Sequence, residues 1–343
     1  MSSTMPFFSP LPDPILKALP KCNIHTHLEG SVRPSTFREL AKLHGLEVEL
    51  ASRTIADSMQ VTGAERNLVD YLQKIEFGYQ VFLGGQEVQR IAYEAAEDAA
   101  LDGVVYLELR AGPVTHSRPG FAVEDVIASI LQGLHQAQEK YGIECRFIVS
   151  ALRHHDPEIN VRLAHVALEC QNDGVVGFDL AGDEAGYPAQ IHAKAFQVAR
   201  DGGLGITIHA GEAAGAEHVR YAVEELGATR IGHGVRSTES DAVLAMLRKR
   251  SVLLEICPTS NVHTNTVNGI QKHPIRKLYD RGILISVGDD DPITSRTTVS
   301  KELTLLHNNF NFTIEEIKSM QQMGITAAFI NDSKLKRKML QLV

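Results

Sequence analysis

The stretch Asn23-Ile24-His25-Thr26-His27 closes a short apolar run and sets two imidazoles two residues apart. Side chains alternate between the two faces of a β-strand, so His25 and His27 point the same way and Thr26 points the other way. Two imidazoles on one face form half of a site for a divalent ion, which a third His and an Asp would complete with room for water. Because the chain has 15 histidines, such a pair can also arise by chance, and its place in the fold decides its meaning.

Seven further apolar, β-branched runs follow this one, with helical stretches between them. Such runs suit strands that are buried on both faces, and their alternation with helices predicts a parallel sheet. The expected strands are Asn23–His27, Val104–Arg110, Cys145–Arg153, Val175–Ala181, Gly205–Glu212, Arg230–Gly234, Val252–Pro258 and Ile283–Asp290. The expected helices are Pro34–His44, Gln86–Leu101, Val123–Tyr141, Asn160–Asn172, Ala189–Asp201, Ala216–Leu226, Thr238–Arg250 and His273–Arg281. This pattern predicts an α/β fold, a (β/α)8 barrel, as one domain over residues 1–343.

Residues 47–85 interrupt this pattern between the first helix and the next one. The stretch Leu68–Phe82 carries apolar and aromatic positions, so we expect a helical insertion after the first strand. Two interpretations stay open for it. It is either a lid over the rim of the barrel or an element of the outer packing.

The positions of several metal-binding side chains agree with the barrel. Active sites of this fold lie at the C-terminal ends of the strands. The residues at the ends of the expected strands include His25 and His27 in the first, Asp179 in the fourth, His209 in the fifth, His233 in the sixth and Asp290 in the eighth. Structural histidines have no reason to gather at one rim, so this pattern predicts a metal site.

Charge and cysteine content narrow the class of protein. The 34 Lys and Arg against 42 Asp and Glu give a net charge of −8, so no overall positive field attracts nucleic acid or an anionic membrane. The four cysteines show neither metal-binding spacing nor a secreted framework. No apolar run is long enough to span a bilayer, and Met1–Pro20 does not read as a signal peptide. We expect a cytoplasmic enzyme with a small-molecule substrate; the oligomeric state is not indicated.

Six motifs carry a resemblance to a known family. They are Asn23–Pro34, Asp179–Glu184, His209–Glu212, Ile231–Val235, Cys257–Asn261 and Asp290–Pro292. In order and spacing they resemble the adenosine/adenine deaminase family of metal-dependent amidohydrolases, most of all adenosine deaminase, from about Leu19 to the final helix. The resemblance implies a TIM barrel with one Zn²⁺ per chain. It also implies hydrolytic removal of the purine 6-amino group by a zinc-bound water, with release of ammonia.

By similarity to the family, the zinc ligands are His25, His27, His209 and Asp290. Zinc can bring the pKa of a bound water near 7, so that it supplies hydroxide at neutral pH. Glu212 is placed to protonate a ring nitrogen, because a partly desolvated site favours its protonated form. The alternative for Glu212 is a residue at a helix start that the helix dipole favours.

The resemblance also implies roles around the purine. His233 and Asp291 look like the pair that orient the attacking water and stabilise its oxygen as negative charge develops. Asp291 would also accept a hydrogen bond at the imidazole side of the purine. The backbone N–H of Gly182 would donate to the pyrimidine ring, with glycine allowing a close approach. Glu29 stands where adenosine deaminases usually have an Asp that reaches the ribose 5′-hydroxyl.

The substrate is left open by these motifs. His-Leu-Glu-Gly at Glu29 is also typical of adenine deaminases, whereas Gly232-His233-Gly234 departs from their usual Asp-His-Gly. Gly288-Asp289 replaces the usual Asn-Thr or Asn-Ser, and an extra carboxylate beside the metal would repel phosphate. Three functions therefore remain: a deaminase of adenosine or 2′-deoxyadenosine, a deaminase of adenine or of a modified (N6-substituted or 5′-extended) adenine nucleoside or nucleotide, and an inactive binding protein. Competent residues at every metal and proton-transfer position favour an active enzyme.

Three other conspicuous groups are expected to have no chemical role. His154-His155-Asp156 is a rim loop without a matching metal partner. Glu255 is expected as a buried carboxylate that is hydrogen-bonded inside the barrel. Cys257 is expected to be packed, since nothing beside it in the sequence supplies a base.

Overall fold

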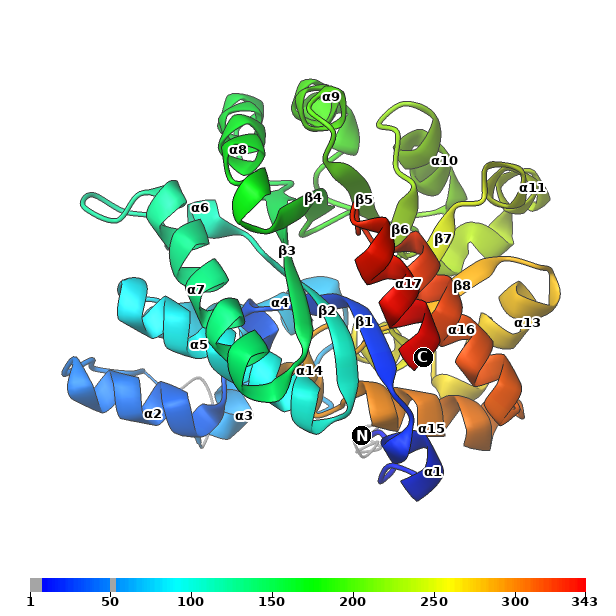
Figure 1. Cartoon of the computed structure of the whole chain (residues 1–343), viewed down its shortest axis with the longest axis horizontal. Coiled ribbons are helices and arrows are strands. Elements are labelled where there is room, and N and C mark those ends of the chain that lie inside the picture. Colours follow the sequence, from blue (N-terminus) through cyan, green and yellow to red (C-terminus); the bar gives the residue numbers. More distant parts are fainter. Residues whose placement is uncertain (1–7, 50–53) are drawn as a thin grey trace.

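The computed structural model describes residues 8–49 and 54–343, and its eight strands form one parallel sheet in the order of the sequence (Figure 1). A bridge between Thr26 and Asp290 links the first strand to the segment after the last one, so the sheet nearly closes on itself. The expected (β/α)8 barrel is confirmed. The strands are β1 Lys21–His27, β2 Val104–Ala111, β3 Glu144–Leu152, β4 Val175–Ala181, β5 Gly205–Ala210, β6 Arg230–His233, β7 Leu253–Ile256 and β8 Leu284–Val287.

The helices surround the sheet (Figure 1). They are α1 Pro14–Ala18, α2 Pro34–Leu43, α3 Ile55–Met59, α4 Leu68–Gly78, α5 Gly85–Leu101, α6 Pro113–His116, α7 Val123–Tyr141, α8 Pro157–Glu169, α9 Ala193–Asp201, α10 Ala216–Glu224, α11 Asp241–Arg250, α12 Pro258–His263, α13 Ile275–Asp280, α14 Pro292–Ser295, α15 Val299–Phe310, α16 Ile314–Ala327 and α17 Ser333–Leu342. The eight expected helices are present, one of them, Val123–Tyr141, with the predicted bounds and the others with one or both ends shifted. Helices α15 and α16 were not expected. Helix α16 contacts β1, β7 and β8, so it covers the junction between the last strand and the first.

Five strands end earlier than their apolar runs predict, β3 and β6 by one residue and β5, β7 and β8 by two or three. Strand β5 stops at Ala210 because Gly211 takes a left-handed backbone conformation with φ +70°. Strand β7 stops before Cys257, where Pro258 begins α12. Strand β8 stops at Val287, and Asp290 follows in a loop with φ +59°. Glu212 and Asp290 therefore lie in rim loops and not at the last positions of strands.

The inside of the barrel carries paired charges instead of a purely apolar filling. The guanidinium of Arg110 lies 2.8 Å from Glu255, and that of Arg230 lies 2.6 Å from Glu108. All four side chains are fully buried. A buried charge is stable only when it is paired and hydrogen-bonded. Removing one member of either pair would therefore leave an unpaired buried charge. Glu255 is thus the hydrogen-bonded barrel carboxylate that its sequence position predicts.

The segment expected as a helical insertion contains α3 and α4, while its residues 50–53 lie outside the described part of the chain. On its inner side, Leu68, Tyr71 and Ile75 of α4 form a small hydrophobic cluster with Val61, apart from the main core. Whether α4 moves as a lid stays a prediction, as does the assignment of the whole chain to one domain.

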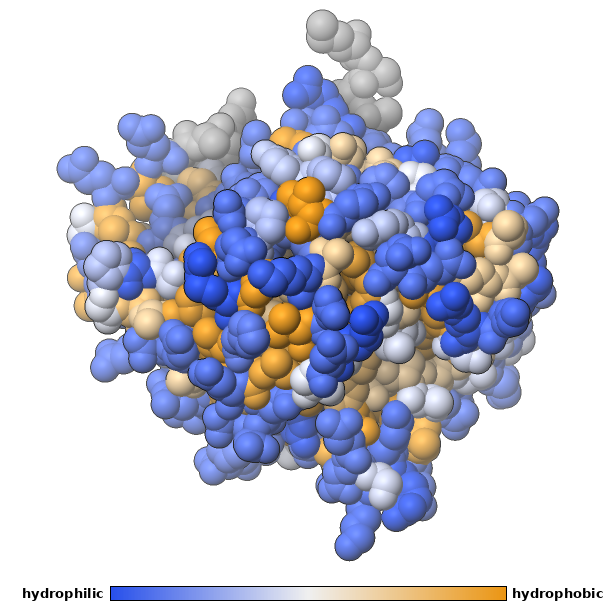
Figure 2. Space-filling model, turned by 90° about the horizontal axis from the view of Figure 1, so that it is seen from above, coloured by the Kyte–Doolittle hydropathy of each residue, from blue (hydrophilic) through white to orange (hydrophobic). Residues whose placement is uncertain are grey.

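The face of the molecule that Figure 2 shows is mostly polar. Hydrophilic side chains cover most of the face seen in Figure 2, and hydrophobic residues show between them only in smaller patches. Among the described helices, none is both long and apolar enough to cross a membrane.

Candidate active site

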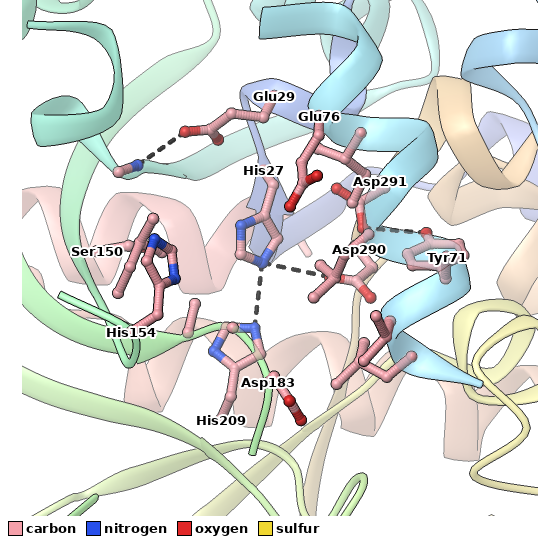
Figure 3. A pocket seen from close by; sticks show the side chains of 18 of the residues that line it. His27, Glu29, Tyr71, Glu76, Ser150, His154, Asp183, His209, Asp290 and Asp291 are labelled. Atoms are coloured by element: carbon pink, nitrogen blue, oxygen red, sulfur yellow. Dashed lines mark hydrogen bonds and ion pairs between the residues drawn. The ribbon is translucent and has the colours of Figure 1, made fainter. Parts of the chain in front are cut away.

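Four side chains from three parts of the barrel meet at its C-terminal rim. His25 and His27 come from β1, His209 from β5, and Asp290 from the loop after β8. One nitrogen or oxygen atom of each lies within 4.8 Å of those of the other three. The Nε2 atom of His27 lies 3.1 Å from Nε2 of His209 and 3.4 Å from Oδ1 of Asp290 (Figure 3). The structure thus brings together all four residues that the sequence analysis proposes as ligands.

The donor set fits a divalent metal ion. Burial lowers the pKa of His27 and of His209, so both imidazoles stay neutral and keep lone pairs for a metal. Burial alone would raise the pKa of Asp290, but His233 and His25 lower it well below its usual value and keep the carboxylate ionised. Burial alone would lower the pKa of His25, but its hydrogen bonds with Asp290 and Glu255 raise it, so a bound cation would have to displace a proton there. Three imidazoles and one carboxylate are ligands that Zn²⁺ accepts in catalytic sites.

Carboxylates behind two of the histidines fix how their rings face. Nδ1 of His25 lies 2.8 Å from Glu255, and Nδ1 of His209 lies 3.0 Å from Asp179. A histidine that donates through Nδ1 presents Nε2 to the site, and such partners orient metal-binding imidazoles. Arg110 bonds the same Glu255 oxygen that His25 contacts, so the charged layer of the barrel also supports the ligand set.

Two residues of the site have unusual backbone conformations. His233 has φ +61° and Asp290 has φ +59°, in the left-handed region that residues other than glycine seldom adopt. Each such conformation costs on the order of 1–3 kcal/mol and persists where the surroundings hold it. Both side chains therefore point toward the cluster of metal-binding residues, and Nε2 of His233 lies 3.9 Å from Oδ2 of Asp290.

Glu212 lies beside this cluster in the loop after β5. Its side chain is buried, and its Oε2 atom is 3.6 Å from Nε2 of His233. Burial and the nearby charge of Asp290 raise the pKa of Glu212 to about 8, so the carboxyl group holds a proton at neutral pH. A cation held by the neighbouring ligands would oppose this rise. A buried, protonated carboxyl group is suited to general acid chemistry.

Asp291 faces another part of the cavity. Its Oδ2 accepts a hydrogen bond of 3.0 Å from the hydroxyl of Tyr71 on α4 (Figure 3). Its Oδ1 is buried and has no hydrogen-bond partner among the described residues. Burial and Asp290 raise the pKa of Asp291 well above its usual value. The predicted pairing of Asp291 with His233 on one water stays a prediction, since the closest charged neighbours of His233 are Glu212 and Asp290.

Glu29 and Gly182 line the same cavity. Oε1 of Glu29 accepts a hydrogen bond of 2.8 Å from the Gly112 N–H and lies 3.2 Å from His116. Gly182 has φ +100°, which disfavours other residues, whereas an added Cβ would meet its nearest neighbour only at 3.7 Å. The need for glycine at position 182 therefore comes from backbone conformation and not from crowding.

The cavity has a volume of about 400 Å³. Six carboxylates line it: Glu29, Glu76, Asp183, Glu212, Asp290 and Asp291. The described lining contains no Lys or Arg. Leu68, Val69, Leu72 and Ile75 of α4 supply an apolar wall, and His154 from the expected rim loop also reaches the lining. The cavity thus offers hydrogen-bond acceptors and an apolar surface to a small ligand.

The comparisons with known proteins agree with this geometry. The model of the adenosine deaminase family matches residues 20–343. An adenosine deaminase of Shewanella denitrificans is 36% identical over 325 residues, which cover 93% of this chain and 97% of that protein. The chain belongs to the adenosine deaminase family.

Solved structures of related proteins share the fold. An N6-methyl-AMP deaminase from Arabidopsis thaliana is 28% identical with a TM-score of 0.84, covering 94% of this chain and 96% of that one. An amidohydrolase from Burkholderia ambifaria with bound zinc is 29% identical with a TM-score of 0.85, covering 94% of this chain and 89% of that one. The adenosine deaminase family is metal-dependent, and this member of it is a hydrolase of the aminopurine deaminase kind.

One expectation about this family member is not supported by the structure. Asp289 does not line the cavity, and its carboxylate accepts a hydrogen bond of 2.7 Å from Asn23. It faces a separate small pocket with Thr26 and Asp102. The argument that Asp289 stands beside the metal and repels phosphate is therefore wrong.

Two residues that support the site were given no role in the sequence analysis, although Glu184 is the last residue of the motif Asp179–Glu184. From the sequence, Tyr71 can be recognised only as an aromatic position of an expected helix. Glu184 accepts hydrogen bonds of 2.8 to 3.0 Å from four consecutive backbone N–H groups, Gly211 to Ala214, and so shapes the loop that carries Glu212. Cys257 is buried, and burial raises the pKa of its thiol well above the usual value, as expected for a packed cysteine.

Proposed function

We propose that this protein is a zinc-dependent deaminase that converts adenosine and 2′-deoxyadenosine to inosine and 2′-deoxyinosine with release of ammonia. The observation that carries the proposal is the convergence of His25, His27, His209 and Asp290 at 4.8 Å or less, beside the buried Glu212. A zinc ion bound there would lower the pKa of a coordinated water toward neutrality.

The side chains of the cavity divide the remaining work. Glu212 would deliver its proton to a ring nitrogen, so that electron density can leave the carbon under attack. The unpartnered Oδ1 of Asp291 would accept a hydrogen bond from the imidazole side of the purine. The Gly182 N–H would donate to the pyrimidine side. Glu29 would accept a hydrogen bond from a sugar hydroxyl.

The charge of the cavity supports an uncharged substrate. A phosphate group carries about −1.5 to −2 charges at neutral pH and is usually held by Arg, Lys or backbone N–H groups. The described lining has six acidic side chains, of which Glu212 holds a proton at neutral pH, and neither Arg nor Lys. Nucleosides therefore suit this cavity better than 5′-monophosphates.

A panel of substrates tests the proposal. We expect adenosine and 2′-deoxyadenosine to have the highest kcat/KM, and AMP a kcat/KM lower by at least about 10²-fold, as like-charge repulsion predicts. Loss of the adenine-type absorbance measures each rate. A preference for adenine or for N6-methyladenosine would replace the proposed substrate by that one, and no turnover on any member of the panel would favour a binding protein.

The role of Glu29 can be separated from that of the base-binding residues. Glu29→Ala is expected to weaken transition-state binding of adenosine by roughly 1–3 kcal/mol, the cost of leaving a buried partner unpaired. Free adenine has no sugar hydroxyl, so its kcat/KM should change much less. Glu29→Gln is the matched control for fold, because its amide oxygen can still accept from the Gly112 N–H. Equal losses on both substrates would assign Glu29 a structural role only.

Tyr71 connects α4 to the site and gives a further prediction. Tyr71→Phe keeps the ring but removes the hydroxyl that donates to Asp291. A typical hydrogen bond contributes about 0.5–1.5 kcal/mol, so kcat/KM on adenosine should fall by roughly 2- to 10-fold. Zinc content and melting temperature serve as controls. An unchanged kcat/KM would show that Asp291 needs no donor from α4.

A further inference from the structure

A row of hydrogen bonds runs from the backbone of α13 to His233. The Ile275 N–H donates to Nδ1 of His273 at 3.2 Å, and Nε2 of His273 lies 3.1 Å from Oδ1 of Asn261. Nδ2 of Asn261 in turn lies 3.0 Å from Nδ1 of His233. His233, Asn261 and His273 are all buried, so water does not compete for these bonds.

The direction of every bond in this row follows from its first member. A backbone N–H can only donate, so Nδ1 of His273 must accept and its ring proton must lie on Nε2. His273 then donates to the carbonyl oxygen of Asn261, which turns the amide N–H toward His233. Nδ1 of His233 therefore accepts, and the ring proton of His233 lies on Nε2.

We propose that Asn261 and His273 are positioning residues that lock His233 in the tautomer with its proton on Nε2. Nε2 is the nitrogen that faces the site, 3.6 Å from Glu212 and 3.9 Å from Asp290. In this tautomer His233 donates a hydrogen bond to an oxygen placed between these carboxylates, and Nε2 has no lone pair to take a proton from it. His233 thus acts as a fixed donor to developing negative charge and not as a general base.

The left-handed backbone at His233 belongs to the same arrangement. With φ +61° the residue ends β6 and turns its ring so that one nitrogen faces Asn261 and the other faces Glu212. Asn261 lies in α12 and His273 precedes α13, and both helices stand between β7 and β8, so the segment after β7 fixes the imidazole at the end of β6. The inference about catalysis rests on the proposed deaminase function, whereas the tautomer itself does not.

The tautomer can be measured directly. The ¹⁵N chemical shifts of a histidine distinguish a protonated ring nitrogen from an unprotonated one. In the full-length protein loaded with zinc, the signals of His233, assigned by their loss in His233→Gln, should show a proton on Nε2 and none on Nδ1. A proton on Nδ1 in the wild type would overturn the proposal whatever the activity is, including a complete lack of deaminase activity.

The substitution Asn261→Asp is expected to move the ring proton of His233 to the other nitrogen. Aspartate has nearly the same shape but only accepts, so it should draw the ring proton of His233 to Nδ1. We expect kcat on adenosine to fall by on the order of 10²–10³-fold, as when a preorganised donor is lost, with little change in KM or zinc content. A variant that carries the proton on Nδ1 of His233 and keeps wild-type kcat would overturn the catalytic part of the proposal.

Two controls separate positioning from folding. Asn160 is also buried and lies 3.1 Å from Nδ1 of His192, outside the cavity, so Asn160→Asp makes the same change beside a different histidine and should leave kcat within about 10-fold of wild type. His273→Gln can still donate to Asn261, whereas His273→Leu cannot. We expect Gln to retain most of the turnover that Leu loses. Equal losses in the two variants would remove His273 from the row.

Discussion

Replacing Glu212 by Gln is expected to lower turnover on adenosine by at least about 10²–10⁴-fold, the usual contribution of general acid catalysis. The amide keeps the shape and the hydrogen-bonding capacity of the carboxyl group but has no proton to transfer at neutral pH. Because Glu212 is not among the four clustered ligands, zinc content should stay unchanged. Steady-state kinetics and metal analysis of the same preparation measure both quantities.

The matched control for this change is Glu217→Gln, a substitution of an exposed carboxylate on α10. It should have wild-type kinetics. If Glu212→Gln lost its zinc, Glu212 would belong to the ligand set, and if it kept near-normal turnover, another group would have to supply the proton.

Removing a ligand should have an effect of similar size by another route. His209→Ala deletes the only ligand from β5, and we expect the purified variant to hold far less than the about one zinc per chain of the wild type, with activity lost in proportion. His135→Ala, which removes an exposed histidine of α7, controls for zinc bound to the surface. Equal zinc in wild type and His209→Ala would reject the ligand assignment.

The fold and much of the site could be predicted because they follow from short-range periodicity. Strand β4 has the bounds Val175–Ala181 that its apolar run predicts, and the alternation within β1 places His25 and His27 on one face. Because active sites of such barrels lie at the C-terminal ends of the strands, residues that are far apart in the sequence could then be assigned to one site. Helices α15 and α16 follow β8 and complete the β/α pattern. They were missed because the eight expected helices already include two, Pro34–His44 and Gln86–Leu101, between the first two strands.

The errors and omissions have equally physical causes. Asp289 was misplaced because the apolar run was expected to continue as a strand to Asp290, whereas β8 ends at Val287 and Asp290 has a left-handed backbone conformation. The direction of the Asp289 side chain therefore depends on a loop that the sequence pattern does not show. Tyr71 could not be found, because its contact with Asp291 depends on how α4 docks onto the rim. Glu184 was missed for the same kind of reason, since four backbone N–H groups converge on it only when the loop is folded.

The most direct test of the account is the release of ammonia from adenosine by the purified chain, measured with zinc bound and again after the metal has been removed by chelation. We predict one ammonia for each inosine formed by the zinc-loaded protein, no turnover after chelation, and recovery when zinc is restored. Turnover that persists in full without metal, or a zinc-loaded protein that releases no ammonia from adenosine, would contradict the proposed function.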